Sequence, residues 1–241
     1  MEILGHIHCL FEQSGVFKNA FRAAGYIALD YDIKNEYQQT DCLYDLFAEI
    51  EKAYCKAYSL FDTFSNDDLI IAFFPCIYFA DVNQMYFNAT SVNYKGLTDL
   101  QKVQKVIARS KARQMYYELI LKLCYISLDR SLRLIIENPF SYNSYLYNNF
   151  PFAPAVVDFD RSQRGDKFKK PTQYFFLNCE PTRLQTVEKK YKTKRIYSLS
   201  GSRIGGICSK ERSEISPEYA RNFINDFIIG KITEKTFKTI F

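Results

Sequence analysis

Tryptophan is absent from the 241 residues, and glycine and proline are scarce, at nine and seven residues. So few chain-breaking residues exclude a fibrous protein and a protein built from long linkers. The sequence does not begin with a basic region followed by an apolar run, and its longest apolar stretches, such as 69–80, are too short to cross a bilayer. We therefore predict a cytoplasmic protein without membrane contact.

Metal-binding motifs are missing as well. The seven cysteines form no Cys-x-x-Cys pair, and no Cys/His pair has the spacing of zinc ligands. An odd number of cysteines in a chain without a signal peptide is typical of reduced thiols in the cytoplasm. The sequence predicts no metal site, and His6 and His8 are interpreted as packed or capping side chains.

The overall composition is that of a globular protein with a large core. Hydrophobic residues make up 47%, charged residues 24% and aromatic residues 17%. The length fits a single domain, placed at 1–241.

Positive charge is concentrated in one part of the chain. The net charge is +5, but residues 161–195 alone hold eleven Lys or Arg against three acidic residues. This segment is either a solvated face or a strip that contacts phosphates. If its end is extended, Lys190, Lys192 and Lys194 lie on one face, where they would bind nucleic acid.

Apolar runs alternate along the chain with stretches of helical periodicity. Gly25 marks the end of the first predicted helix, and Ser216 with Pro217 marks the start of the last. Such alternation predicts an α/β fold with a mostly parallel central sheet. The predicted strands are 3–11, 26–29, 69–74, 132–136, 156–159 and 173–177, and the predicted helices are 16–24, 45–58, 97–128 and 217–229.

Polar or reactive groups follow four of these predicted elements. They are the turn at Gly15, the pair Asp30 and Asp32, Cys76, and Glu137. In open α/β sheets, ligands bind beyond the carboxyl ends of the strands. We therefore expect these groups to contribute to one site.

Two of the strand ends resemble motifs of the DNA cytosine-5 methyltransferase family, particularly its short phage-like members. The segment Asp68-Leu-Ile-Ile-Ala-Phe-Phe-Pro-Cys76 is similar to the family's strand ending in Phe-Pro-Cys. The segment Leu134-Ile-Ile-Glu-Asn-Pro139 is similar to its strand ending in Glu-Asn-Val or Glu-Asn-Pro. Weaker matches extend the resemblance over about residues 7–225; they are 10–15, 29–32, 45–47, 163–165, 170–172 and 212–218.

The resemblance implies a Rossmann-like, S-adenosylmethionine-dependent methyltransferase fold with a small basic lobe at 173–212. It implies S-adenosylmethionine as the cofactor and DNA as the partner. It makes Cys76 the nucleophile and Glu137 the ligand of the base edge, with Arg164 supporting the ring oxygen or the thiolate. The implied cofactor-binding residues are Phe11, Gly15, Asp30, Tyr31, Asp45, Leu46 and Pro75.

These residue types suit that chemistry. Carbon 5 of cytosine is a poor nucleophile, and thiolate attack on carbon 6 converts the ring into an enamine that accepts a methyl group. The Glu137 carboxyl group at N3 and the exocyclic amine would support the developing charge. Asp30 offers hydrogen-bond acceptors for ribose hydroxyls. Tyr31 offers an aromatic face on which adenine can stack, and Asp45 offers an acceptor for the adenine amino group.

Other hypotheses remain open. Gln13 stands where the family's cofactor loop has glycine, and Ile77–Ala80 replaces Gln-x-Phe-Ser. The second change alters the loop over the base, and Gln13 favours a degenerate methyltransferase-like module that binds nucleic acid or a protein. The short segment between Thr172 and Arg212 favours a methyltransferase acting on RNA or a free nucleotide. The aromatic-rich stretch 140–152 is either a packed loop or a platform on which bases stack.

Overall fold

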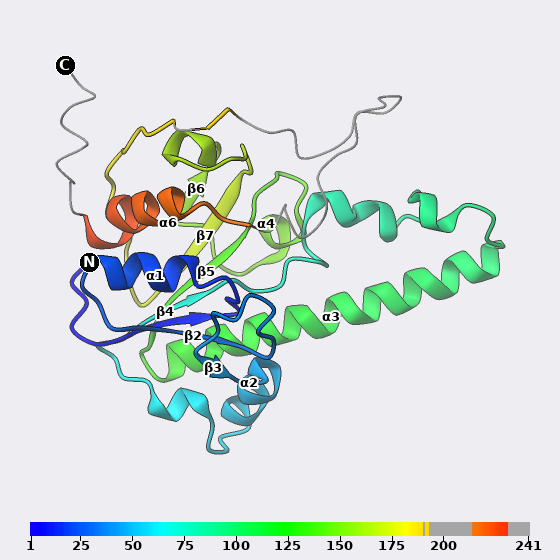
Figure 1. Ribbon diagram of the computed structural model, residues 1–241. Helices are drawn as coiled ribbons and strands as arrows, with labels where there is room; N and C mark the ends of the chain where they lie inside the picture. Colours follow the sequence, from blue (N-terminus) through cyan, green and yellow to red (C-terminus); the bar gives the residue numbers. More distant parts are fainter. Residues whose placement is uncertain (190, 193–213, 231–241) are drawn as a thin grey trace.

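Seven strands form one sheet in the computed structural model, which describes residues 1–189, 191–192 and 214–230 (Figure 1). The strand order is β3-β2-β1-β4-β5-β7-β6. All neighbouring pairs are parallel except those that involve β7, which runs antiparallel to β5 and β6. The strands are β1 (Ile7–Leu10), β2 (Ala28–Asp32), β3 (Cys42–Leu43), β4 (Leu69–Ala72), β5 (Arg133–Pro139), β6 (Val156–Asp158) and β7 (Thr172–Leu177).

The strand order reverses between β1 and β4. From β1 the chain proceeds outward to β2 and β3, and it then returns to place β4 on the other side of β1. Such a reversal leaves a crevice at the carboxyl ends of the two central strands, where open α/β sheets bind their ligands.

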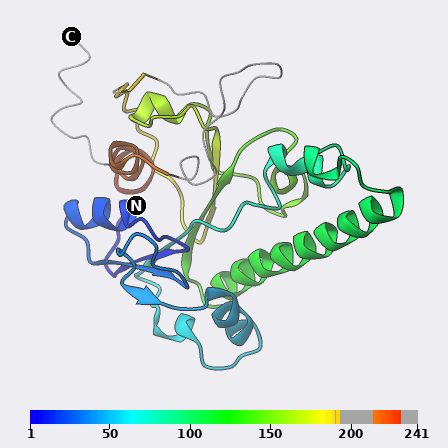
Figure 2. The same ribbon diagram turned by 45° about the vertical axis from the view of Figure 1, so that its right-hand side comes forward.

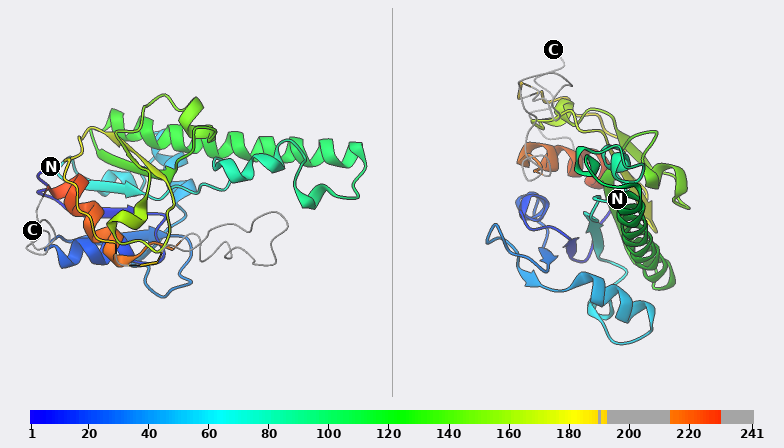
Figure 3. Two further views of the ribbon diagram at one scale, coloured as in Figure 1. Left: turned by 90° about the horizontal axis from the view of Figure 1, so that it is seen from above. Right: turned by 90° about the vertical axis from the view of Figure 1, so that its right-hand side faces the viewer.

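Helices cover both faces of the sheet (Figures 1 and 3). On one face, α1 (Val16–Ala23) packs beside α6 (Pro217–Phe223), which continues as a π-helical segment, Ile224–Ile229. On the other face lie α2 (Leu46–Tyr54) and α3 (Asp99–Asp129). A short helix, α4 (Tyr145–Asn149), follows β5.

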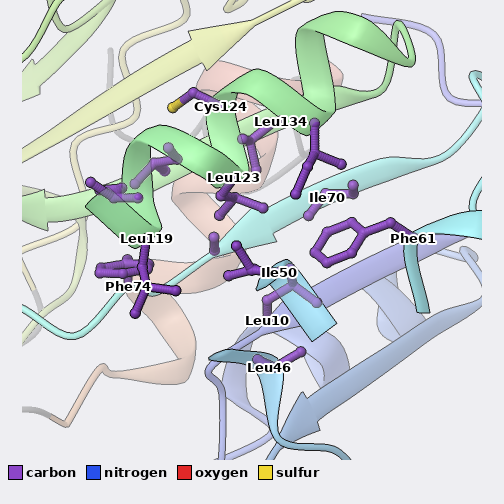
Figure 4. Packing of buried hydrophobic residues seen from close by; sticks show 14 of the residues in the cluster. Leu10, Leu46, Ile50, Phe61, Ile70, Phe74, Leu119, Leu123, Cys124 and Leu134 are labelled. Carbon is purple, nitrogen blue, oxygen red and sulfur yellow. The ribbon is translucent and has the colours of Figure 1, made fainter. Parts of the chain in front are cut away.

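The larger part of the core lies between the sheet and the pair α2 and α3 (Figure 4). Leu10 and Ile70 come from neighbouring strands, and Leu119 and Leu123 come from α3 one helical turn apart. This spacing places both leucines on the face of α3 that meets the sheet. The opposite face of the sheet has its own apolar cluster, in which Phe17 of α1 contacts Phe223 of α6.

The first half of α3 projects beyond the sheet (Figures 2 and 3). Thr98 and Gln101 form a capping box that fixes its start. Only its second half, from Leu119, is buried, and two 3-10 turns, Asp81–Tyr86 and Val92–Tyr94, accompany the exposed half. The segment after Cys76 is therefore part of a helical arm.

The predicted α/β architecture with a mostly parallel sheet is confirmed. Several predicted strand limits are wrong. The strands β1 and β4 are shorter than the runs 3–11 and 69–74, β2 is shifted from 26–29 to Ala28–Asp32, and the short strand β3 was not predicted. The strand β5 continues through Pro139 because its pairing with β7 reaches that residue. The segment 173–212 is not wholly a peripheral lobe, since 173–177 pairs within the sheet. Its positions 193–212 lie outside the described residues. Within the described part of the chain, no helix has the length and apolar character needed to span a membrane.

Candidate functional site

A cleft of about 410 Å³ lies at the carboxyl ends of β1, β4 and β5. It therefore occupies the crevice expected where the strand order reverses. Segments far apart in the sequence meet there. The lining residues are Phe11, Glu12, Gln13, Ser14, Glu36, Tyr37, Phe73, Phe74, Pro75, Cys76, Glu137, Lys170, Glu214 and Ile215.

Cys76 and Glu137 both line this cleft. Cys76 follows β4, and Glu137 lies near the carboxyl end of β5, which runs parallel to β4. The side-chain amide of Asn138 donates to the Phe74 carbonyl (3.3 Å), which ties β5 to the segment that leads to Cys76. The Cys76 carbonyl accepts from the amides of Phe79 and Ala80, so the chain turns directly after the cysteine. The sheet thus brings the two predicted catalytic side chains into one cavity.

One carboxylate oxygen of Glu137 is buried without a hydrogen-bond partner. Glu137 is 7% exposed, and no donor among the described residues lies within hydrogen-bond distance of its Oε1. Leaving a buried acceptor unpaired costs about 1–3 kcal/mol, so such atoms tend to mark ligand sites. Gln13 Oε1, in the same cleft, is likewise buried and unpaired.

The loop between β1 and α1 is held in an unusual backbone conformation. Phe11 has a φ of 60°, and its amide donates to the Tyr31 carbonyl. A non-glycine residue in the left-handed region is strained, and such strain clusters at functional sites. Gly15, with a φ of 66°, allows the turn into α1. It does not line the cleft, whereas its neighbour Ser14 does.

Glu12 caps α1 from within the cleft wall. Its Oε1 accepts from the Phe17 amide (2.7 Å) and its Oε2 from the Lys18 amide (3.2 Å). These bonds satisfy two amides at the start of the helix. Burial nevertheless raises the pKa of Glu12 to about 7, so its charge changes near neutrality.

Carboxylates outnumber basic groups in the described lining of the cleft. The part of the chain that the structure describes contributes four glutamates, namely Glu12, Glu36, Glu137 and Glu214, and one basic residue, Lys170. A concave surface lined by one sign of charge attracts ligands of the opposite sign. The cleft therefore favours a cationic small molecule.

Asp30, which is predicted to bind a ribose, forms a buried ion pair with a lysine. Lys18 Nζ lies 3.0 Å from Asp30 Oδ2 and 3.2 Å from Asp41 Oδ2, and the Asp41 amide donates to Asp30 Oδ1. Burial raises the pKa of Asp30, against the effect of these partners. Asp30 lies inside β2 and does not line the cleft.

The other predicted cofactor residues divide into two groups. Phe11 and Pro75 line the cleft. Tyr31 is buried, with its hydroxyl hydrogen-bonded to His8 (2.9 Å), and Leu46 belongs to the core. Asp45 caps α2, since its carboxylate accepts from Phe47 and Ala48.

Arg164 lies outside the cleft lining. Its guanidinium forms ion pairs with Asp158 (2.9 Å) and Asp226 (3.0 Å), so it joins β6 to the π-helical segment Ile224–Ile229. The structure therefore does not bring Arg164 together with Cys76 and Glu137 in the cleft lining. Arg161 is also buried; it pairs with Asp166 nearby in the chain, and its guanidinium lies 4.4 Å from the centroid of the Tyr219 ring in α6.

The remaining predictions concern the basic strip and the histidines. Lys192 is exposed, whereas Lys190 and Lys194 lie outside the described residues. His8 is packed as expected, since it stacks on Phe64 and lies 3.3 Å from Asp68. In the described ranges, no group of His, Cys, Asp and Glu side chains is arranged to hold a metal ion.

Sequence reasoning missed several cleft residues. Lys170 and Glu214 belong to short motifs that were singled out, but nothing in the sequence placed them beside Cys76. Glu12 had a readable signal, because an acidic residue just before a helix often accepts from its first amides. The buried ion pair of Lys18, which lies outside the cleft lining, had no such signal, because a lysine on a surface helix is usually solvated.

No protein-family model and no curated protein matches this chain. The activity is therefore inferred from its own residues and their geometry.

Proposed function

We propose that this protein transfers a methyl group from S-adenosylmethionine to carbon 5 of cytosine in DNA. The observation that carries the proposal is that Cys76 and Glu137 line one cleft, with an oxygen of Glu137 buried and unpaired. A nucleophile and a carboxyl group on adjacent strand ends suit a flat heterocycle held between them. The mostly parallel sheet is compatible with the Rossmann-like fold that the resemblance implies.

In this proposal Cys76 and Glu137 act in sequence on the base. The Cys76 thiolate bonds to carbon 6, and the electrons of the ring double bond become available at carbon 5. Glu137 binds N3 and the exocyclic amine, stabilising the ring as charge develops. After carbon 5 has gained the methyl group and lost its proton, the bond between Cys76 and carbon 6 breaks and the double bond returns.

The cleft also suits the methyl donor. S-adenosylmethionine, when bound, supplies a methyl group from a positively charged sulfonium, and it also carries an ammonium group. Glu36 and Glu214, which also line the cleft, match these charges, and Phe11 offers an apolar surface in the same lining. Asp30 does not bind its ribose while Lys18 holds it, so that role would fall to Glu36 or another lining residue.

One observation favours a second candidate. The burial of Asp30 against Lys18, together with Gln13 in the cofactor loop, fits a module that has lost the cofactor and binds nucleic acid or a protein. The two candidates differ in cofactor binding. Micromolar binding of S-adenosylhomocysteine in calorimetry supports the enzyme, and no binding at millimolar ligand supports the module.

Covalent trapping tests the methyltransferase directly. DNA in which 5-fluorocytosine replaces cytosine should form an adduct with the protein in the presence of S-adenosylmethionine, because fluorine cannot leave as a proton. Cys76→Ser should abolish the adduct. Cys124→Ser should not, since Cys124 is buried in α3 and burial raises its pKa to about 12. Absence of any adduct over varied DNA sequences would contradict the proposal.

A further inference from the structure

Four aromatic rings form a cluster beside the cleft, and three of them are exposed. Phe140 lies at the centre, 5.1 Å from Tyr142, 5.2 Å from Tyr147 and 5.3 Å from Phe159 between ring centroids. Phe140 is nearly buried, but Tyr142 is 66% and Phe159 56% exposed. The exposed rings Tyr142, Tyr147 and Phe159 are named here the aromatic platform.

The platform is held in place by its surroundings. The Phe140 amide donates to the Pro171 carbonyl (2.9 Å), and Asn148 Nδ2 of α4 donates to the Tyr142 carbonyl (2.8 Å). The rings meet edge to face, the geometry that aromatic pairs prefer. Their exposed surface is therefore fixed and does not fold back into the core. Contiguous exposed rings of this kind mark interaction sites.

Unpaired positive charge adjoins the platform. Lys170, which lines the cleft, precedes Pro171, and Lys169 is exposed beside it. No described carboxylate lies within ion-pair distance of Lys167, Lys169 or Lys170. Asp158 pairs with Arg164 and Asp166 pairs with Arg161, whereas Glu137 and Glu214 share the cleft lining with Lys170 without a described ion pair to it.

We propose that the aromatic platform binds unpaired nucleobases of single-stranded or locally opened nucleic acid. Aromatic faces stack on any base, and adjacent lysines neutralise the phosphates that join the bases. The backbone connects the two features, because Pro139 ends the strand that carries Glu137 and Phe140 follows it. A base held at Glu137 would thus have its neighbours over the platform; this last point rests on the proposed function.

The test compares binding of a short fluorescein-labelled oligothymidylate with binding of a duplex of equal length, by fluorescence anisotropy. The double variant Tyr142→Ala/Phe159→Ala should weaken single-strand binding by about ten- to a hundredfold. It should leave the slope of log K against log salt unchanged, since no cation is removed. Tyr58→Ala is the matched control, because Tyr58 is 81% exposed away from the platform. Circular dichroism checks that each variant is folded.

The outcomes separate this inference from the proposed function. Wild-type affinity in the double variant, or no single-strand binding by the wild type, overturns the platform. Binding of an acidic protein at the platform, without binding of oligothymidylate, also overturns the inference. Weakened single-strand binding together with no 5-fluorocytosine adduct supports the platform and contradicts the methyltransferase. An adduct with unaltered single-strand binding gives the reverse result.

Discussion

Lys18 Nζ lies 3.0 Å from Asp30 Oδ2, and the two side chains are 2% and 0% exposed. Removing one partner of such a pair leaves a charge buried without compensation. We expect Lys18→Met to lower the free energy of unfolding by about 3–5 kcal/mol, measured by urea denaturation. Lys34→Met, which breaks the exposed pair with Glu36, should cost less than about 1 kcal/mol. Equal effects of the two substitutions would contradict the importance of the buried pair.

Glu12 should make stability depend on pH. Its pKa of about 7 in the folded protein exceeds the value near ~4.3 of an unfolded chain. Between these values the folded state binds the extra proton, so stability falls as pH rises, by up to about 1.4 kcal/mol per pH unit. In Glu12→Gln this contribution is absent. Denaturation at several pH values should show the difference between the proteins changing across that window; a constant difference would contradict it.

Glu137→Gln should impair methyl transfer without harming the fold. The amide lacks the acidic proton that a carboxyl group can give to N3 as negative charge develops on the ring after thiolate attack, and losses of such interactions are about 10²–10³-fold. Stability should hold or rise, because glutamine keeps the shape of this buried side chain and carries no charge. Transfer of labelled methyl groups to DNA measures the first effect and thermal denaturation the second. Glu118→Gln, on the exposed side of α3, should retain full activity.

Arg109 fixes the segment that follows Cys76. Its Nη2 donates to the Ile77 carbonyl (2.8 Å), and its guanidinium lies over the rings of Tyr78 (4.4 Å) and Tyr86 (5.0 Å). A lysine keeps the charge but loses the planar stacking. Arg109→Lys should therefore speed amide hydrogen exchange over 77–87, as measured by mass spectrometry. Lys111→Ala, an exposed position on the same helix, should leave this exchange unchanged.

The basic strip gives a prediction in terms of salt. Each phosphate neutralised on duplex DNA contributes about −0.9 to the slope of log K against log salt. Replacing Lys190, Lys192 and Lys194 by Ala should flatten that slope by roughly two to three units. Binding of S-adenosylhomocysteine should stay the same, since Lys192, the one of the three that the structure describes, does not line the cleft. An unaltered slope would show that these lysines do not contact phosphates.

The sheet was predictable because its central strands are almost purely apolar. Ile70 is buried on one face of the sheet and Ile135 on the other, and a short, β-branched apolar run bounded by polar or turn residues indicates such a strand. The reversed direction of β7 was not predictable. It depends on pairing with β5, which is distant in sequence and leaves no local signature.

The site was only partly predictable for a related reason. Cys76 and Glu137 followed recognisable strands, so their meeting could be expected from parallel pairing. The ion pairs of Asp30 with Lys18 and of Arg164 with Asp158 could not be predicted. A sequence pattern does not distinguish a solvated charge from a charge with a buried partner.

The packing of α1 against α6 has a consequence for biosynthesis. One face of the sheet is covered jointly by residues near position 20 and residues near position 220, and the amine of Met1 donates to the Ile228 carbonyl. A ribosome must therefore translate through this last helix before the first strand can bury its second face. Until then Ile7 and Phe17 stay open to water, which makes the nascent chain a substrate for chaperones and gives its folding a high contact order.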